Sequence, residues 1–317
     1  MRWSGERLAD RVRGRGPLPG PDFPLATPAF ATPRATDGGL RATWVGHSTV
    51  LLQLGDVNVL TDPMWGDRAS PFSWAGPRRH VPPAFPLAAL PPVDVVLMSH
   101  DHYDHLDADT VRTLATAHPD ARWVAPLGVG ARLLAMGVQQ VVELDWGEET
   151  NAAGLQITCT PAQHFSGRSL VDRDTTLWCG FAVRAAGVCV FYAGDTGYHP
   201  AFTDIAKRYG PFDLALLPIG AYAPRWFMQP VHMDADEAVA SAADLMRPYP
   251  GHRMAMLPVH WGTFRLTDEP MEEPPKRAAD AWAARGLPTD DFWLLRHGET
   301  KFRDPDAAVS ERSKPVR

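Results

Sequence analysis

The sequence predicts an α/β protein in which two β-sheets lie face to face with helices on their outer sides. Short β-rich segments occur in two blocks, one before residue 100 and one around residues 155–192, and helical segments follow each block. Each sheet must bury its apolar face against another layer, so two such blocks in one chain favour two packed sheets. The composition, 45% hydrophobic and 21% charged, is that of an ordinary globular protein.

The first block begins near residue 40. Apolar and alternating runs predict strands at 41–45, 49–54 and 57–61, with a turn at Gly55-Asp56. Asp62-Pro63 ends this block, and an irregular, proline-rich stretch with several aromatic residues follows. An apolar run at 93–98 then predicts a buried strand.

The rest of the chain alternates between strand and helix patterns. Further strands are expected at 122–125, 141–144, 155–160, 177–183, 188–192, 213–217, 253–257 and 292–295. Helices are expected at 107–117, 128–136, 202–209, 234–246 and 276–285. Glu237, three residues after Asp234, predicts a capping box at the start of one helix.

We expect three parts in the chain: an Arg/Pro-rich arm at 1–39, one folded domain at 40–303, and a tail at 304–317. The first fifteen residues contain five arginines and two acidic residues. Two interpretations of this arm stay open, contact with an anionic membrane surface or a solvated arm that lies on its own domain. The aromatic stretch from Trp65 to Phe85 also has two interpretations, a surface for an apolar ligand or a proline-stiffened cover over the core.

Charge and cysteine content exclude several classes of protein. The net charge of −6 provides no general attraction to nucleic acid, so no nucleic-acid partner is expected. The cysteines, Cys159, Cys179 and Cys189, lie in apolar strand-like runs, and their odd number argues against a disulfide framework. Neither a secretory signal nor a run of about eighteen apolar residues occurs, which predicts a cytoplasmic protein, free or bound peripherally to a membrane. The oligomeric state stays open, a dimer included.

A cluster of potential metal ligands follows the strand at 93–98. His100, His102, Asp104 and His105 have the spacing H-x-H-x-D-H, directly after the apolar run. Imidazole nitrogens and carboxylate oxygens are ligands that zinc accepts. The alternative is a polar loop that caps a strand, and four ligand-type side chains within six residues argue against it.

Three more potential ligands come just after other strands. They are His164, Asp195 and His260. Loops beyond strand ends are where α/β proteins assemble their sites, so we expect these junctions to converge on one edge of the sheets. Seven ligands are too many for one tetrahedral zinc ion, and they suit two ions close together.

These motifs resemble those of the metallo-β-lactamase-fold hydrolases. A narrower resemblance, to the N-acyl-phosphatidylethanolamine-hydrolysing phospholipase D family, extends over residues 40–303. The segments that carry it are 43–49, 60–63, 99–107, 194–198, 211–214, 218–222, 224–228 and 260–264.

The resemblance implies an α/β fold of the metallo-β-lactamase type, a four-layer αβ/βα sandwich, with two zinc ions. Iron or manganese are alternatives for such ligands. The implied ligands are His100, His102 and His164 for the first ion, Asp104, His105 and His260 for the second, and Asp195 as the bridge between them. His232 matches the family's histidine near the substrate phosphate, and His47 and Asp62 resemble residues that orient metal ligands.

Some positions depart from the family pattern or allow two roles. Asp101 replaces the amide residue often found between the first two histidines, and we expect it to add a charge beside the metals. Gly167 stands where mammalian members carry a lysine. Arg225 and Trp226 lie either beside the phosphate or in the packing of the domain, and we expect packing.

The expected reaction is hydrolysis of a phosphodiester by a hydroxide shared between the two metal ions. Asp104 would steer the hydroxide, and His232 would hydrogen-bond the phosphate or protonate the leaving oxygen. For the family's phospholipid substrate, the resemblance implies an N-acylethanolamine and phosphatidic acid as products. The alternatives are another dinuclear hydrolase of the same fold, such as a lactonase, a cyclic phosphodiesterase or a soluble-ester hydrolase, and a metal-binding module without activity.

Overall fold

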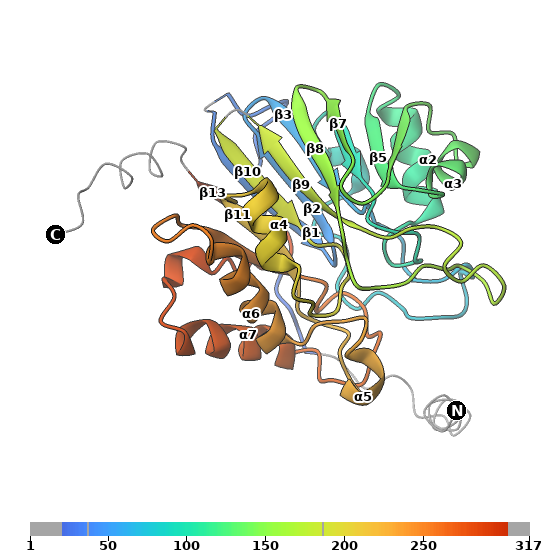
Figure 1. Ribbon diagram of the computed structural model, residues 1–317. Helices are drawn as coiled ribbons and strands as arrows, with labels where there is room; N and C mark the ends of the chain where they lie inside the picture. Colours follow the sequence, from blue (N-terminus) through green and yellow to red (C-terminus); the bar gives the residue numbers. More distant parts are fainter. Residues whose placement is uncertain (1–20, 37, 186, 304–317) are drawn as a thin grey trace, which may run out of the picture.

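The computed structural model describes residues 21–36, 38–185 and 187–303, which form two β-sheets packed face to face with helices outside them (Figure 1). The first sheet has the strand order β13-β1-β2-β3-β4-β5-β6. Its strands are β1 (Leu40–Gly46), β2 (Thr49–Leu54), β3 (Val57–Thr61), β4 (Val95–Leu97), β5 (Arg122–Pro126), β6 (Val141–Leu144) and β13 (Thr300–Arg303). The pairs β13–β1, β1–β2 and β2–β3 are antiparallel, and β3, β4, β5 and β6 run parallel to one another.

The second sheet has the strand order β12-β11-β10-β9-β8-β7. Its strands are β7 (Glu149–Ala152), β8 (Leu155–Thr160), β9 (Gly180–Ala185), β10 (Val188–Tyr192), β11 (Leu214–Pro218) and β12 (Ala255–Val259). β10, β11 and β12 are parallel, and the other pairs are antiparallel. Each sheet is therefore mixed, and its parallel strands end at one edge.

The α-helices are divided between the two outer faces. They are α2 (Ala108–Ala117), α3 (Gly130–Ala135), α4 (Phe202–Tyr209), α5 (Arg225–Met228), α6 (Ala235–Met246) and α7 (Glu273–Ala284), and two short 3-10 segments are η1 (Leu87–Ala89) and η2 (Thr289–Asp291). Apolar residues of α2 and α3 pack against the first sheet, and those of α4, α6 and α7 belong to the core of the second. The chain thus has the four-layer αβ/βα sandwich that the sequence predicts.

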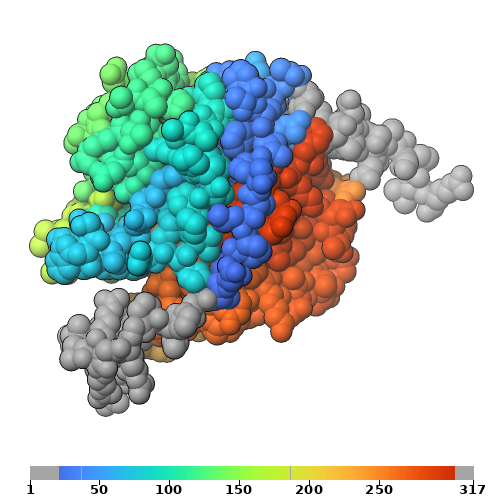
Figure 2. Space-filling view, turned by 180° about the vertical axis from the view of Figure 1, so that it is seen from behind, coloured from blue at the N-terminus to red at the C-terminus, as the bar shows by residue number. Residues whose placement is uncertain are grey.

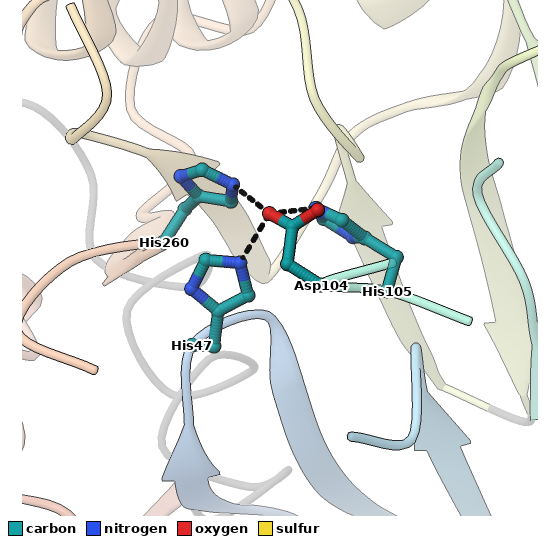
Figure 3. Close-up of side chains that lie close together, drawn as sticks. All are labelled: His47, Asp104, His105 and His260. Atoms are coloured by element: carbon teal, nitrogen blue, oxygen red, sulfur yellow. Dashed lines mark hydrogen bonds and ion pairs between the residues drawn. The ribbon is translucent and has the colours of Figure 1, made fainter. Parts of the chain in front are cut away.

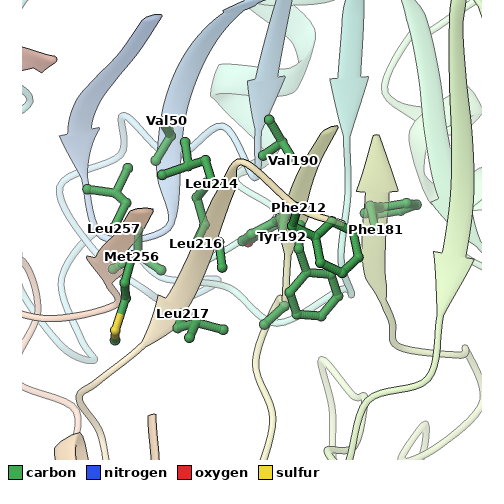
Figure 4. Close-up of a cluster of buried hydrophobic side chains, with 14 of the residues drawn as sticks. Val50, Phe181, Val190, Tyr192, Phe212, Leu214, Leu216, Leu217, Met256 and Leu257 are labelled. Carbon is green, nitrogen blue, oxygen red and sulfur yellow. The ribbon is translucent and has the colours of Figure 1, made fainter. Parts of the chain in front are cut away.

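The alternation of side chains along a strand explains how one sheet serves two cores. In β2, Val50 and Leu52 face the second sheet, whereas Leu51 faces the layer of α2 and α3. Between the sheets, Val50 and Leu52 belong to one buried cluster with residues of the second sheet such as Val190 and Leu214 (Figure 4). The sheets are therefore fixed against each other by close apolar packing, which gives the loops at their edge a rigid base.

Most predicted elements are confirmed, including the capping box, in which the Asp234 carboxylate accepts from the backbone N–H of Glu237. The strand predicted at 292–295 is wrong: this segment follows η2 and makes only an isolated bridge between Phe292 and Met256. The last strand is instead β13, which pairs with β1. The sequence prediction also missed β7 and the four-residue helix α5.

The described part of the predicted arm lies on the domain. Phe23 packs edge-on against Trp261, at 5.5 Å between ring centroids, and Phe30 lies 5.2 Å from Phe85. The Gln53 side chain accepts from the N–H of Ala31 and donates to its carbonyl. The basic segment for which membrane contact was considered, and the tail at 304–317, lie outside the described residues. In the described part, no helix combines the length and apolar character needed to cross a bilayer.

Candidate metal centre

The residues predicted from the sequence come together at one edge of the two sheets. His47 lies in the turn between β1 and β2, and the other residues follow the ends of strands or precede α6. The strands β3, β4, β8, β10 and β12 are followed by Asp62, by the segment 100–105, by His164, by Asp195 and by His260, respectively. His232 comes three residues before α6. All of these side chains belong to clusters in which the potential ligand atoms lie within 4.8 Å of one another.

Three histidines form the first cluster. His102 Nδ1 lies 2.9 Å from His100 Nε2 and 3.2 Å from His164 Nε2. The other ring nitrogen of His164, Nδ1, is 2.9 Å from the carbonyl of Val231 and donates to it, so its Nε2 carries a lone pair. Ser99 Oγ donates to Asp62, so it accepts from His100 Nδ1, and His100 Nε2 also carries a lone pair.

This geometry fits a cation. His102 Nδ1 can donate one proton at most, and it faces the lone pairs of both His100 and His164. Burial lowers the pKa of His100 and of His164 well below the usual value, and the neighbouring histidines lower it further, so these rings stay neutral. Among the described residues, at least one buried lone pair is left without a donor, and a metal ion among the three nitrogens would satisfy all of them.

The second cluster is centred on one carboxylate oxygen (Figure 3). Asp104 Oδ2 lies 2.8 Å from His47 Nε2, 3.3 Å from His260 Nε2 and 3.4 Å from His105 Nε2. Burial alone would raise the pKa of Asp104, but His105, His260 and His47 outweigh it and hold this pKa well below the usual value. The carboxylate is therefore ionised, as it must be to bind a metal ion, and histidine nitrogens surround it.

Asp195 lies between the two clusters. Its Oδ2 is 3.1 Å from Nε2 of both His105 and His260, 3.8 Å from His164 Nε2 and 4.0 Å from His100 Nε2. Its Oδ1 is buried and has no hydrogen-bond partner among the residues that the structure describes. One carboxylate thus faces both nitrogen sets, and its second oxygen is available to a cation.

The charges in the second cluster also fit a cation. Burial would lower the pKa of His105, but Asp195 and Asp104 outweigh it and raise this pKa well above the usual value. The same balance raises the pKa of His260 to about 9. Without metal, the protonated rings of His105 and His260 therefore balance the negative charges of Asp104 and Asp195. A bound metal ion would take the place of the protons on these two histidines.

Asp62 fixes the orientation of the His105 ring through a hydrogen bond to its Nδ1. Its carboxylate accepts from His105 Nδ1 at 2.6 Å, from the Tyr192 hydroxyl at 2.5 Å, from the backbone N–H of Ser99 at 2.7 Å and from the Ser99 hydroxyl. Because Nδ1 of His105 donates to Asp62, its Nε2 is turned toward Asp104 and Asp195.

His47 lies within the second cluster, not behind it. Its ring centroid is 4.0 Å from that of His260, and its Nε2 contacts Asp104 directly. The backbone of His47 is in the left-handed region with φ of 53°, and its N–H donates to Thr263 Oγ1 while its carbonyl accepts from the N–H of His260. His47 is thus tied to the loop that carries His260, and its side chain orients Asp104.

His232 is buried beside the same centre. Its Nε2 is 3.9 Å from Asp195 Oδ2, and its ring centroid is 4.9 Å from that of His164. Burial, as the largest cause, lowers its pKa to about 4, so the ring is neutral at pH 7. Arg225 donates to the carbonyl of His232 at 2.9 Å and pairs with Glu237, contacts that agree with the packing role expected for it. The packing role expected for Trp226 is wrong, because this side chain is 77% exposed.

Asp101 contributes to the centre in a way that the sequence did not indicate. Its carboxylate lies 2.9 Å from Arg132 Nε and accepts from the N–H of Gly167, so its charge is paired with that of Arg132. Arg168 donates to the carbonyls of Asp101 and Leu106, at 2.7 and 2.8 Å. The loop with the H-x-H-x-D-H motif is therefore held at both ends, and no local pattern in the sequence marks Arg132 or Arg168 for this role.

Comparison with known proteins agrees with the fold. The family model described as the Beta-lactamase superfamily domain matches residues 57–261. An uncharacterized protein from Mycobacterium tuberculosis is 47% identical over 261 residues, which cover 82% of this chain and 68% of the relative. The N-acyl-phosphatidylethanolamine-hydrolyzing phospholipase D 1 of Caenorhabditis elegans is 42% identical over 276 residues, covering 83% of this chain and 76% of the relative. Among solved structures, the metallo hydrolase Igni18 from Ignicoccus hospitalis has a TM-score of 0.60 at 22% identity, covering 84% of this chain and 98% of Igni18.

The fold and the clustered histidines and aspartates define a metal-dependent hydrolase, and the chain belongs to the metallo-β-lactamase superfamily. Within this superfamily, it is homologous to proteins named N-acyl-phosphatidylethanolamine-hydrolysing phospholipase D.

Removing one histidine from each cluster tests the two metal sites separately. We expect His102→Ala and His260→Ala each to lower the bound metal by about one equivalent per chain, because each removes a ligand from a different set. Elemental analysis of the purified proteins measures this. His80→Ala, a histidine outside both clusters, is the control, and full metal content in both site variants would contradict the assignment.

Asp62→Asn tests the support behind His105. The asparagine side chain cannot accept from all four donors, and its NH₂ group would oppose His105 Nδ1–H. We expect metal affinity to fall roughly 10–100-fold in a chelator competition assay. The exposed substitution Asp109→Asn is the matched control, and an affinity equal to the wild type would show that Asp62 does not orient the ligand.

Proposed function

We propose that the chain is a dinuclear zinc phosphodiesterase that cleaves N-acyl-phosphatidylethanolamine-like phospholipids. The observation that carries this proposal is the 42% identity to the phospholipase D of C. elegans, over 76% of that protein. Water would add to phosphorus, and the bond from phosphorus to the ethanolamine oxygen would break, which yields phosphatidic acid and an N-acylethanolamine. The catalytic unit in this proposal is residues 40–303.

The ligand assignment follows the two clusters. His100, His102 and His164 would hold one ion, and Asp104, His105 and His260 the other, with Asp195 between them. What supports this assignment is the distance of Asp195 Oδ2 from nitrogens of both sets, 3.1 Å on one side and 3.8 to 4.0 Å on the other. Bound there, two zinc ions would supply a water of lowered pKa and positive charge for a phosphoryl oxygen. Iron and manganese accept the same ligand types.

Asp104 and His232 would act on the reacting groups. Asp104 would orient the attacking water, since its ionised carboxylate is held by His47 on one side and His260 on the other. His232 is neutral and lies beside Asp195, and its Nδ1 has no hydrogen-bond partner in the described part of the chain. A neutral imidazole with a free N–H would hydrogen-bond the phosphate and stabilise the charge that develops on it.

A product assay tests the proposed reaction. We expect zinc-loaded protein to release labelled phosphatidic acid from N-acyl-phosphatidylethanolamine in mixed micelles, and chelation to abolish the release until zinc is restored. Asp195→Ala should have no activity, because both ligand sets lose a carboxylate. Hydrolysis of a soluble cyclic phosphodiester, a lactone or a simple ester, with none of the phospholipid, would instead support another dinuclear hydrolase of this fold.

Substitution of His232 separates a substrate contact from a metal ligand. We expect His232→Ala to lower kcat/KM by about 10²-fold or more and His232→Gln to lower it less, because glutamine keeps an N–H donor. Both variants should retain the full metal content. Loss of metal in His232→Ala would show that His232 is a ligand, which its place beside His164 and Asp195 also allows.

A further inference from the structure

Asp101 carries a fully buried charge between two of the candidate ligands in the sequence, His100 and His102. Its side chain is 0% exposed. One carboxylate oxygen accepts from the N–H of Gly167 at 2.9 Å, and the other lies 2.9 Å from Arg132 Nε. Within the part of the chain that the structure describes, Arg132 is the only cation that pairs with this carboxylate. Because a buried carboxylate is costly without a counter-charge, the charge of Asp101 depends on Arg132.

The same guanidinium holds a second carboxylate. Arg132 lies on α3, on the outer face of the first sheet, and its Nη2 donates to Asp172 at 2.9 Å. Asp172 belongs to the loop 165–176, where it also accepts from the N–H of Ser169 at 2.6 Å. The tip of this loop, Leu170-Val171, is exposed. In Figure 2, the yellow-green surface of the loop adjoins the green surface of the segment that contains α3, in agreement with this contact.

The loop 165–176 packs against the first histidine cluster. The centroid of the Phe165 ring lies 4.6 Å from that of His102 and 4.8 Å from that of His164. Gly167, whose N–H donates to Asp101, belongs to the same loop. The position of the loop therefore affects both of these histidine rings, and Asp101 and Asp172 connect that position to α3.

We infer that Arg132 is a positioning residue for the metal ion of the first cluster, an inference that rests on the ligand assignment in the proposed function. It compensates the charge of Asp101 between two ligands, and through Asp172 it fixes the loop that packs on His102. Arginine suits this place because its planar guanidinium directs several N–H donors outward and can meet two carboxylates at once. The compact ammonium group of lysine cannot span them in the same way.

Burial distinguishes this ion pair from an ordinary surface pair. Arg112 and Asp109 on α2 form a surface pair, with side chains 58% and 92% exposed, and such pairs contribute little because water replaces either partner. Water cannot replace Arg132 at the buried carboxylate of Asp101. Without Arg132, that carboxylate would take up a proton or turn toward a bound cation. Either change would shift the backbone between the two histidines that flank it.

Zinc titration in two single-site backgrounds tests the inference without any substrate. His260→Ala keeps the first cluster complete, and His102→Ala keeps the second. Zinc is titrated into the metal-free proteins in competition with a chromophoric chelator. We expect Arg132→Met to weaken zinc binding roughly tenfold or more in the His260→Ala background and to leave it unchanged in the His102→Ala background. Arg112→Met is the matched control and should change neither affinity.

Substitutions that change charge and shape separately show how Arg132 acts. Asn at position 101 keeps an oxygen for the N–H of Gly167 and carries no charge. In the His260→Ala background, Arg132→Met should therefore cost much less affinity when Asp101→Asn is also present. Arg132→Lys keeps the charge and should restore only part of the affinity. Cobalt(II) bound in the His260→Ala background should show an altered visible spectrum with Arg132→Met, because the ligand geometry changes.

Thermal unfolding of the metal-free proteins separates positioning from a structural role. A lower unfolding temperature with unchanged zinc affinity in both backgrounds would overturn the inference, and so would an equal loss of affinity in both. Loss of all zinc in His260→Ala alone would refute the ligand assignment and the inference with it. The expected affinities in a protein that cleaves no phospholipid would support the inference and refute the proposed substrate. Phospholipid cleavage with wild-type zinc affinity in Arg132→Met would overturn the inference alone.

Discussion

The buried carboxylate of Asp62 connects the fold to the metal centre. It follows β3, and its donors come from the end of β4, from the last residue of β10 in the opposite sheet, and from His105. Burying a carboxylate costs several kcal/mol unless hydrogen bonds compensate for the lost water. Four donors provide that compensation, and they do so only while both sheets and the motif loop keep their relative positions. The same carboxylate therefore specifies the packing of the sheets and the orientation of His105, a candidate metal ligand.

Much of the centre could be predicted because its residues interrupt strong apolar patterns. A histidine or an aspartate directly after a buried strand, as in His100 or Asp195, stands out against the run that precedes it. Parallel strands then bring their ends to one edge, so residues far apart in sequence meet without any long-range signal of their own. His164 and His260 illustrate this, since each lies at the end of a different strand in the second sheet.

Other features depend on contacts that the local sequence does not encode. The segment 292–295 has the apolar character of a strand, but its backbone meets β12 at only one residue, and the edge of the first sheet is taken by β13. β13 pairs with a strand more than 250 residues away, and three of its four residues, Thr300, Lys301 and Arg303, are polar, so its pairing with Leu40 and its neighbours is a tertiary effect. The charge at Asp101 could be seen in the sequence, but its partner Arg132 lies on α3, which packs on the outer face of the first sheet. A sequence pattern therefore predicts a charge, and only the packing shows whether it acts on the metals.

Arg132 connects the H-x-H-x-D-H loop to the loop 165–176. One side of its guanidinium pairs with Asp101, which lies between two candidate metal ligands in the sequence, and the other side pairs with Asp172, which fixes the loop of Leu170 and Val171. Arg168, from that same loop, holds both ends of the motif loop through backbone carbonyls. Because these contacts are short and partly buried, the exposed tip and the metal loop form one connected unit. The position of the H-x-H-x-D-H loop and that of the Leu170-Val171 tip are consequently set by the same few hydrogen bonds and ion pairs.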